Sequence, residues 1–193
     1  MLRARFGELV DNADDLVGHY TYVVAGDGDF QEPVVLGSGS MAGHWGLSRL
    51  IVFYDSNNAQ ISGNVDRSDS TNYAQVFEGF GWHVQEIDGH NYDQICEAIE
   101  KAQVVDRPSL IIGTTTMAKG SANMEGDHET HGAPLPQEEI NATKEQLGLP
   151  DESFYLPQEV IDFFQSRFSS LSDSVVKWNE DTNAALNNDK FQS

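Results

Sequence analysis

Four short apolar segments, separated by segments with helical patterns, constrain the fold of this chain more than any other feature. Residues 50–54 (Leu-Ile-Val-Phe-Tyr) are a continuous apolar run, typical of a strand buried on both faces of a sheet. Strands that alternate with helices favour a mostly parallel sheet with helices on both faces. The expected strands are residues 20–25, 50–54, 83–87 and 109–114. The sequence therefore predicts a three-layer α/β fold.

The segments around these strands carry helical patterns. We expect helices over residues 32–47, 72–80, 92–102 and 137–147, and also over most of residues 1–17. A last helix begins at Pro157, and its apolar residues predict a buried stripe: Val160, Ile161, Phe163, Phe164, Phe168 and Leu171. The predicted organisation is one domain over residues 1–176, followed by a polar tail or linker over residues 177–193.

Glycines in the segment 32–47 pose a local problem for a helix. Gly37, Gly39 and Gly43 each cost roughly 1 kcal/mol relative to Ala in a helix interior. Close approach of another helix would offset this cost, and the alternative is that part of the segment is a loop. Either interpretation makes this segment a test of the predicted fold.

Charge limits the partners of the chain. Its 193 residues include 11 Lys and Arg against 31 Asp and Glu, which gives a formal net charge of −20. Nucleic acids and anionic membranes both require a basic face, so we expect neither as a partner. An anionic ligand is still compatible if a cation and backbone N–H groups bind it locally. Because Cys96 is the single cysteine, no intrachain disulfide can form, and its position predicts that it faces the core. The sequence contains no apolar run long enough for a membrane span and no apolar signal core, so we expect a cytoplasmic location.

A polar motif lies at the end of the first predicted strand. Gly26-Asp27-Gly28 allows a tight turn and close approach of backbone N–H groups to an anion. Thirty positions after Asp27, beyond the next strand, lies Asn57. Neighbouring parallel strands would bring these two side chains to one edge, where carboxylate and amide oxygens suit Mg²⁺. An ordinary turn is the alternative interpretation of the Gly-Asp-Gly motif alone.

The long segment 116–136 contains Gly, Ser and His and is predicted to be a loop. Loops of this length inside a compact domain are usually functional or disordered. His128 and His131 are three residues apart, as metal ligands on a helix often are, but the neighbouring Gly and Pro residues argue against a helix and hence against a zinc site. Lys119 is either a cation for a phosphate or an exposed loop lysine.

Several of these segments together resemble the transketolase family of thiamine diphosphate enzymes. They are residues 22–32 (YVVAGDGDFQE), 42–44 (AGH), 50–55 (LIVFYD), 113–116 (GTTT), 120–121 (GS), 131–135 (HGAPL) and 157–160 (PQEV). The likeness covers about residues 16–167 and implies the thiamine diphosphate-binding fold. Two departures are Pro33, where Gly is usual, and the Gly-Ser run at 37–40.

The resemblance implies a cofactor site made of residues from three segments. Asp27, Asn57 and the carbonyl of Ala59 would bind Mg²⁺ or Ca²⁺. The adjacent Asn58 is an alternative ligand, but the spacing to Gly63 and the end of the apolar run favour Asn57. The other implied residues are Gly26 and Gly28 facing the diphosphate, Ile61 near the thiazolium, His131 at the diphosphate and reacting centre, and Glu32 at a dimer interface with a role in catalysis.

By the same resemblance, the implied reaction is transfer of a two-carbon ketol unit between sugar phosphates, as in the pentose phosphate pathway. The sequence has no segment for the pyrimidine-binding domain of the family, so we expect a fragment or split subunit that acts with a complementary domain, as a homodimer or hetero-oligomer. One alternative is an E1-type 2-oxo acid dehydrogenase component, to which Glu32-Pro33 is similar. Another is a non-catalytic remnant.

Overall fold

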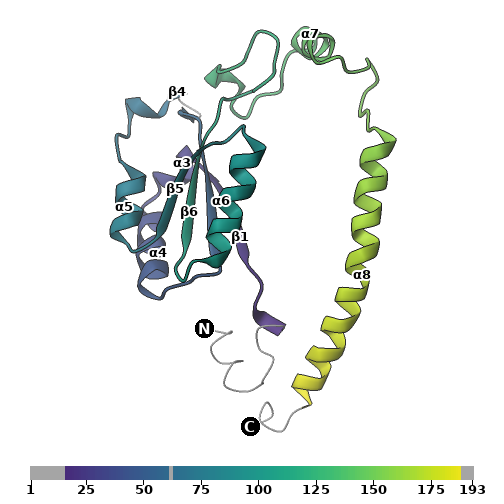
Figure 1. Ribbon diagram of the computed structural model, residues 1–193. Coiled ribbons are helices and arrows are strands. Elements are labelled where there is room, and N and C mark those ends of the chain that lie inside the picture. Colours follow the sequence, from purple (N-terminus) through teal and green to yellow (C-terminus); the bar gives the residue numbers. More distant parts are fainter. Residues whose placement is uncertain (1–15, 61–62, 188–193) are drawn as a thin grey trace. The chain divides into compact units, whose positions relative to one another are not determined.

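The computed structural model describes residues 16–60 and 63–187 of the chain, drawn in Figure 1. The chain divides into two compact units, Tyr20–Asp151 and a second unit made of Met1–His19 with Glu152–Ser193. The larger unit contains the sheet. Most of the predicted helix at residues 1–17 lies outside the described residues.

The sheet of the larger unit has four parallel strands in the order β1-β2-β6-β5. Their bounds are Thr21–Gly26 for β1, Leu50–Ser56 for β2, Ser109–Thr114 for β6 and His83–Asp88 for β5. This confirms the predicted α/β fold with a parallel sheet. The register pairs Gly26, the last residue of β1, with Asp55, the residue before the end of β2.

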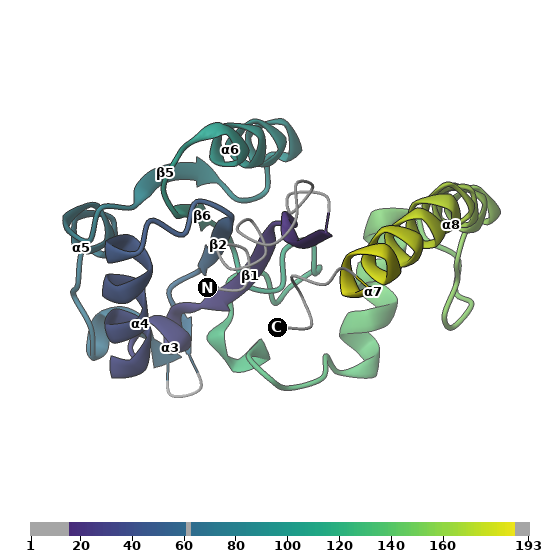
Figure 2. The same cartoon turned by 90° about the horizontal axis from the view of Figure 1, so that it is seen from below.

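Helices cover both faces of this sheet, as Figures 1 and 2 show. Helices α4 (Pro33–His44) and α5 (Tyr73–Gly79) lie on one face, and α6 (Tyr92–Val104) lies on the other. Alternation along β2 serves both layers, because Tyr54 belongs to the α4–α5 core and Ile51 to the α6 core. The apolar run of β2 is therefore explained by burial on two faces.

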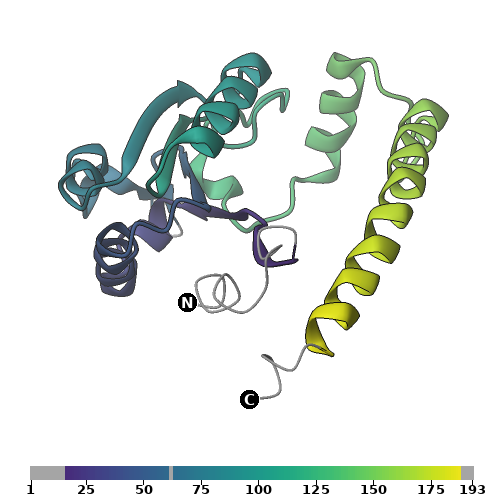
Figure 3. The ribbon, with the colours of Figure 1, turned by 60° about the horizontal axis from the view of Figure 1, so that its bottom comes forward.

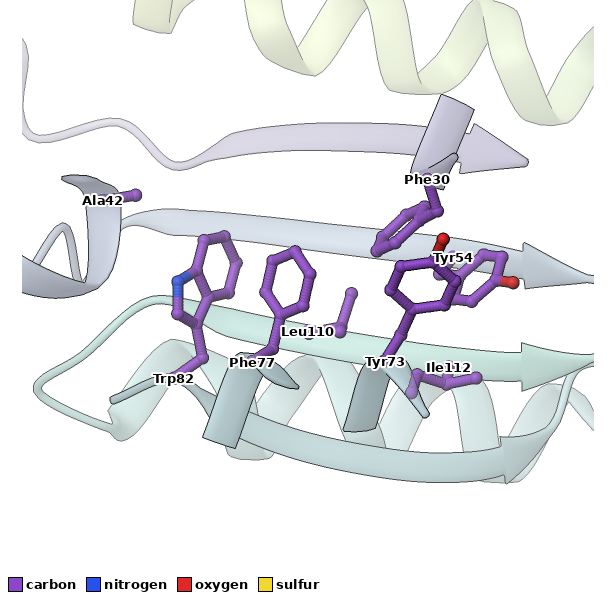
Figure 4. Close-up of a cluster of buried hydrophobic side chains, with 8 residues drawn as sticks. All are labelled: Phe30, Ala42, Tyr54, Tyr73, Phe77, Trp82, Leu110 and Ile112. Atoms are coloured by element: carbon purple, nitrogen blue, oxygen red, sulfur yellow. The ribbon is translucent and has the colours of Figure 1, made fainter. Parts of the chain in front are cut away.

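The α4–α5 core is largely aromatic (Figure 4). Its buried members are Phe30, Ala42, Tyr54, Tyr73, Phe77, Trp82, Leu110 and Ile112. In Figure 4 the rings of Phe30, Tyr54 and Tyr73 gather at one end of the cluster, and those of Phe77 and Trp82 lie at the other. The first end adjoins the carboxyl ends of β1 and β2.

The glycine-rich segment forms a helix, and its glycines explain how. A Cβ atom on Gly39 would lie 2.9 Å from a ring carbon of Phe77, and one on Gly43 would lie 1.9 Å from the backbone oxygen of Phe80. The indole N–H of Trp82 also donates to the carbonyl of Gly39 at 2.8 Å. The expected close approach therefore occurs within the chain, against α5 and the residues that follow it.

Short elements surround the carboxyl edge of the sheet. Helix α3 (Asp27–Phe30) follows β1 directly. After β2 comes a two-stranded antiparallel ribbon, β3 (Ala59–Gln60) and β4 (Gly63–Asn64), followed by the 3-10 turn η1 (Val65–Arg67). The predicted loop 116–136 contains only the turn η2 (His128–Thr130), and helix α7 (Gln137–Leu147) follows it, with the predicted bounds.

The second unit consists mainly of helix α8 (Gln158–Leu186), seen along its length in Figure 3. Within this unit the indole N–H of Trp178 donates to the carbonyl of Leu16 at 3.0 Å. The prediction of a buried stripe is wrong for four residues of α8: Phe163, Phe164, Phe168 and Leu171 are exposed. An apolar stripe is buried only where another element packs on it, and no described element of this unit covers these side chains.

Two further expectations concern the helices. Cys96 is exposed on α6, whereas Ala98 is buried; the prediction that Cys96 faces the core is wrong because residues two apart lie on opposite sides of a helix. Helix α8 continues across residue 177 to Leu186, and the division into residues 1–176 and 177–193 stays a prediction. Within the described ranges, no helix is both long and apolar enough to span a membrane.

Candidate functional site

The carboxyl ends of β1 and β2 place a buried carboxylate next to an asparagine. Asp27 is the first residue of α3, immediately after β1, and is only 4% exposed. Its Oδ2 accepts the backbone N–H groups of Asn57 at 3.1 Å and of Ala59 at 3.4 Å. The Oδ1 atom of Asn57 accepts the same Ala59 N–H at 2.9 Å. A carboxylate oxygen and an amide oxygen therefore converge on one point at the edge of the sheet.

A tyrosine holds the other oxygen of this carboxylate. The hydroxyl of Tyr54 donates to Oδ1 of Asp27 at 2.6 Å. Burial and, to a lesser degree, the hydrogen bond to Asp27 raise the pKa of Tyr54 well above its ordinary value, so the phenol stays protonated as a donor. Among the described residues no basic side chain pairs with Asp27, so its charge is oriented without being neutralised.

A second carboxylate fixes the asparagine. Asp55 follows Tyr54 in β2, and its Oδ2 accepts the side-chain N–H of Asn57 at 3.3 Å. Its Oδ1 accepts the hydroxyl of Thr115, which follows β6. This hydrogen bonding fixes the assignment of the Asn57 amide, with nitrogen toward Asp55 and oxygen toward Ala59. Three strands thus contribute to the arrangement.

The structure distinguishes between the two neighbouring asparagines. Asn58 has a left-handed backbone, with φ of 57°, and its side-chain oxygen accepts the N–H of Asp66 at 3.3 Å. It therefore stabilises the turn toward η1, while Asn57 is the one beside Asp27.

Polar side chains anchor α3 to the ribbon that follows β2. The amide of Gln31 donates to Oε1 of Gln60 at 2.9 Å, and the amide of Gln60 donates to the hydroxyl of Ser68 at 2.9 Å. The hydroxyl of Ser68 in turn donates to Oε1 of Gln31 at 3.3 Å. This closed set of hydrogen bonds fixes the backbone on both sides of the Asp27–Asn57 pair.

None of the other predicted site residues in the described part of the chain makes a hydrogen bond to the Asp27 side chain. No atom lies within 4 Å of the position of a Cβ atom on Gly28, and for Gly26 the nearest is the Asp29 carboxylate at 4.0 Å. Glu32 is the exposed N-cap residue of α4, and its side chain makes no hydrogen bond to the described residues. His131 is exposed at the end of η2, which contacts β4. Ile61 lies outside the described residues.

Lys119 forms an ion pair with a glutamate of its own loop. Its ammonium group lies 2.7 Å from a carboxylate oxygen of Glu125, which also accepts the N–H of Gly120 at 3.0 Å. The ion pair lowers the pKa of Glu125 and keeps its negative charge beside the lysine. Lys119 therefore stabilises the loop 116–136 in this structure.

Sequence reasoning missed Tyr54, Asp55 and Thr115. Tyr54 was part of an apolar run, but a buried tyrosine usually needs a hydrogen-bond partner for its hydroxyl. The register of a parallel sheet makes a carboxylate after the neighbouring strand the natural candidate, and this signal was available in Asp27. The contacts of Asp55 and Thr115 depended on the order of β2 and β6, which the sequence did not specify.

The residues present are suited to a divalent cation bound to an anion. Mg²⁺ and Ca²⁺ take carboxylate, amide and carbonyl oxygens, and Asp27 offers a buried, uncompensated charge beside the Asn57 oxygen. The described part of the chain contains no cluster of three or more His, Cys, Asp or Glu side chains able to hold a metal. A cation here would therefore need amide, carbonyl and ligand oxygens in addition to one carboxylate.

Comparison with known proteins agrees with the fold. The family model described as "Transketolase, thiamine diphosphate binding domain" matches residues 2–192. A transketolase from Sinorhizobium medicae is 42% identical over 160 residues, which are 83% of this chain and 22% of that protein. A transketolase from Halalkalibacterium halodurans is 40% identical over 168 residues, 86% of this chain and 25% of that protein. The crystal structure of Campylobacter jejuni transketolase superposes with a TM-score of 0.87 at 39% identity, covering 93% of this chain and 28% of that one.

The parallel sheet, with polar side chains at the ends of β1 and β2, defines an α/β domain of the type that places ligands at the carboxyl edge of its strands. Within that class, the chain belongs to the transketolase family, as its thiamine diphosphate-binding domain. It spans about a quarter of the length of the curated relatives it matches, for example 25% of the Halalkalibacterium halodurans protein.

Proposed function

We propose that this domain binds the diphosphate of thiamine diphosphate through Mg²⁺ or Ca²⁺, held by Asp27, Asn57 and the carbonyl of Ala59. The observation that carries the proposal is the convergence of Asp27 Oδ2 and Asn57 Oδ1 on the single N–H of Ala59. A cation bound beside this N–H could contact both oxygens at once, and it would offset the buried charge of Asp27.

The backbone around Asp27 suits the anionic part of the ligand. The open space at Gly28 leaves the backbone accessible to a diphosphate, and Gly26 is the extended N-cap residue immediately before Asp27. Basic residues are scarce in this chain, 11 against 31 acidic ones, so the cation would supply most of the positive charge that the diphosphate requires. Ile61 would contribute an apolar contact near the thiazolium.

In the complete reaction, the domain would bind the cofactor that transfers a two-carbon ketol unit between sugar phosphates. Thiamine diphosphate, when bound, supplies the electron sink for carbanion chemistry, while the protein binds and orients it. His131 would act at the diphosphate and the reacting centre, and Glu32 at an interface between subunits. A pyrimidine-binding domain, in the same or another chain, would complete the site, and a dimer would bring Glu32 to its partner.

Calorimetry tests the metal-dependent step. We expect thiamine diphosphate to bind the chain only with Mg²⁺ or Ca²⁺, and we expect Asp27→Ala to abolish binding. Asp66→Ala is the matched control, because Asp66 is an exposed carboxylate near the same ribbon. Binding without a metal, or equal binding by the Asp27→Ala and control variants, would overturn the proposed site.

An activity assay tests the reaction itself. The chain mixed with a transketolase pyrimidine-binding domain is expected to transfer a ketol unit from a pentose phosphate to an aldose phosphate. Turnover of a 2-oxo acid instead would favour an E1-type component. Cofactor binding without either activity would favour a non-catalytic domain.

A further inference from the structure

Two tyrosines in the α4–α5 core each hold a carboxylate. The rings of Phe30 and Tyr54 stack with centroids 4.1 Å apart, and Tyr73 packs edge-on against both. Figure 4 shows the three rings together. The hydroxyl of Tyr54 donates to Asp27 at 2.6 Å, and that of Tyr73 donates to Asp69 at 2.6 Å. The two pairs therefore share chemistry, bond length and packing environment.

The two carboxylates differ in how their second oxygen is satisfied. For Asp69, Oδ1 accepts the backbone N–H of Thr71 at 2.9 Å and its hydroxyl at 2.6 Å. For Asp27, Oδ2 accepts only the N–H groups of Asn57 at 3.1 Å and of Ala59 at 3.4 Å. The Ala59 N–H is also shared with Oδ1 of Asn57. Both oxygens of Asp69 thus accept short hydrogen bonds, whereas Oδ2 of Asp27 accepts only longer ones and stays available to a cation.

The chemical nature of the donor matters at Asp27. A lysine or arginine in place of Tyr54 would bring a positive charge that competes with a cation for the carboxylate. A tyrosine hydroxyl fixes one oxygen and leaves the net negative charge in place. The ring has little freedom to move, because it is 6% exposed and stacked on Phe30, which belongs to the same short helix as Asp27.

We propose that Tyr54 is a positioning residue for the divalent cation: its hydroxyl holds Oδ1 of Asp27 so that Oδ2 faces the cation beside Asn57. This inference rests on the proposed function, because it concerns the same cation. It adds a role for a residue that does not itself touch the cation or the diphosphate. Partners that orient a metal ligand typically change metal affinity 10–100-fold when removed.

The test compares Tyr54→Phe with Tyr73→Phe in the full chain. Each variant keeps its ring and loses one tyrosine–aspartate hydrogen bond of the same length. Electron paramagnetic resonance of Mn²⁺, titrated in the presence of thiamine diphosphate, measures cation affinity, and thermal unfolding without metal measures stability. We expect Tyr54→Phe to weaken Mn²⁺ binding about 10–100-fold and Tyr73→Phe to leave it near the wild-type value.

A measurement on the wild-type chain avoids dependence on the folding of the variant. With tyrosine labelled with ¹³C at Cζ, saturation with Mg²⁺ and thiamine diphosphate is expected to shift the signal of Tyr54 and leave that of Tyr73 in place. Equal Mn²⁺ affinities for the two variants, or a Tyr54 signal that does not respond, would overturn the positioning role alone. No Mn²⁺ binding by the wild-type chain would instead overturn the proposed function from which the inference starts.

Discussion

The carboxyl edge around Asp27 and the contact between α4 and α5 are adjoining parts of one unit that follow different physical rules. At the edge, a buried carboxylate is held by one short hydrogen bond and two long ones, and the residues around Gly28 leave open space. Between α4 and α5, glycines allow ring and backbone atoms to approach so closely that no Cβ would fit at Gly43. The carboxylate charge therefore determines what the first region can bind, and steric fit determines how the second region packs.

This difference indicates what substitutions will do in each region. A change at the edge should alter ligand binding more than stability, because the hydrogen bonds to Oδ2 of Asp27 are long and the space beside Gly28 is open. A change in the packed contact should alter stability more than binding, because interiors are as dense as organic crystals and adapt poorly to added volume. Phe30 and Tyr54 connect the two regions, since they pack in the core and adjoin Asp27.

The largest effect is expected from Phe30→Ala, which removes the ring that stacks on Tyr54. Phe30 is 1% exposed, and truncation of a buried phenylalanine typically costs about 3–5 kcal/mol of unfolding free energy. Because Tyr54 then loses its stacking partner, cation binding per folded molecule should also weaken. Urea unfolding and metal-dependent calorimetry measure the two quantities.

Phe168→Ala is the control for this substitution, because Phe168 is 65% exposed on α8. Its unfolding free energy should change by no more than about 0.5 kcal/mol. If Phe30→Ala lowered stability and left cation affinity per folded molecule unchanged, the two regions would be independent and the link through Tyr54 would be wrong.

Gly43→Ala tests the packed region by itself. The new methyl group would lie 1.9 Å from the backbone oxygen of Phe80, so the helix or the backbone must shift. Overpacking of this kind costs about 1–3 kcal/mol, well above the helix-propensity gain of Ala. The unfolding free energy should fall while cofactor affinity per folded molecule stays near the wild-type value; a stabilised variant would contradict the close approach.

The sequence predicted the fold well where local patterns decide it. The strand at Ser109–Thr114 and the helix at Gln137–Leu147 have the predicted bounds, and alternation of strands with helices was sufficient to predict the parallel sheet. The pairing of Asp27 with Asn57 followed from the rule that ligand-binding residues gather at strand ends. These features depend on neighbouring residues and on strand direction alone.

Other features depend on contacts between distant segments and were not predictable in the same way. The partners of Gly39 and Gly43 became clear only when α5 was placed beside α4. The stripe of α8 looked like core because apolar spacing does not reveal whether a second element covers it. The hydroxyl of Tyr54 required the register of β1 against β2, which is a tertiary property.

Gly37→Ala sharpens the contrast with the opposite sign. Gly37 lies in the same helix, and no atom lies within 4 Å of the position of its Cβ. Replacing a helical glycine by alanine without a steric clash stabilises by about 0.5–1 kcal/mol. A gain in urea unfolding free energy is therefore expected at position 37, and a loss there would show that crowding along α4 extends beyond Gly39 and Gly43.

The smallest effect is expected from the titration of His83, at the start of β5 next to Trp82 of the packed core. Its Nδ1 lies 3.3 Å from the hydroxyl of Ser109. Burial and, secondarily, the charge of Arg107 lower the pKa of His83 below its ordinary value of 6.5. Below pH 6.5 the unfolded chain therefore binds a proton more readily than the folded chain, and stability falls as pH decreases toward the lower pKa of the folded state.

His83→Gln removes this titration and keeps a polar group beside Ser109. The loss of unfolding free energy between pH 7.5 and 5.5 should be smaller in His83→Gln than in the wild-type chain, and Arg107→Gln should reduce it in part. Both substitutions should leave cofactor affinity at pH 7.5 unchanged, because His83 lies at the amino end of β5, whereas Asp27 lies at the carboxyl edge of the sheet. An equal pH dependence in all three chains would show that the acid sensitivity of the fold arises elsewhere. A change in cofactor affinity would show that the amino end of the sheet is coupled to the carboxyl edge around Asp27.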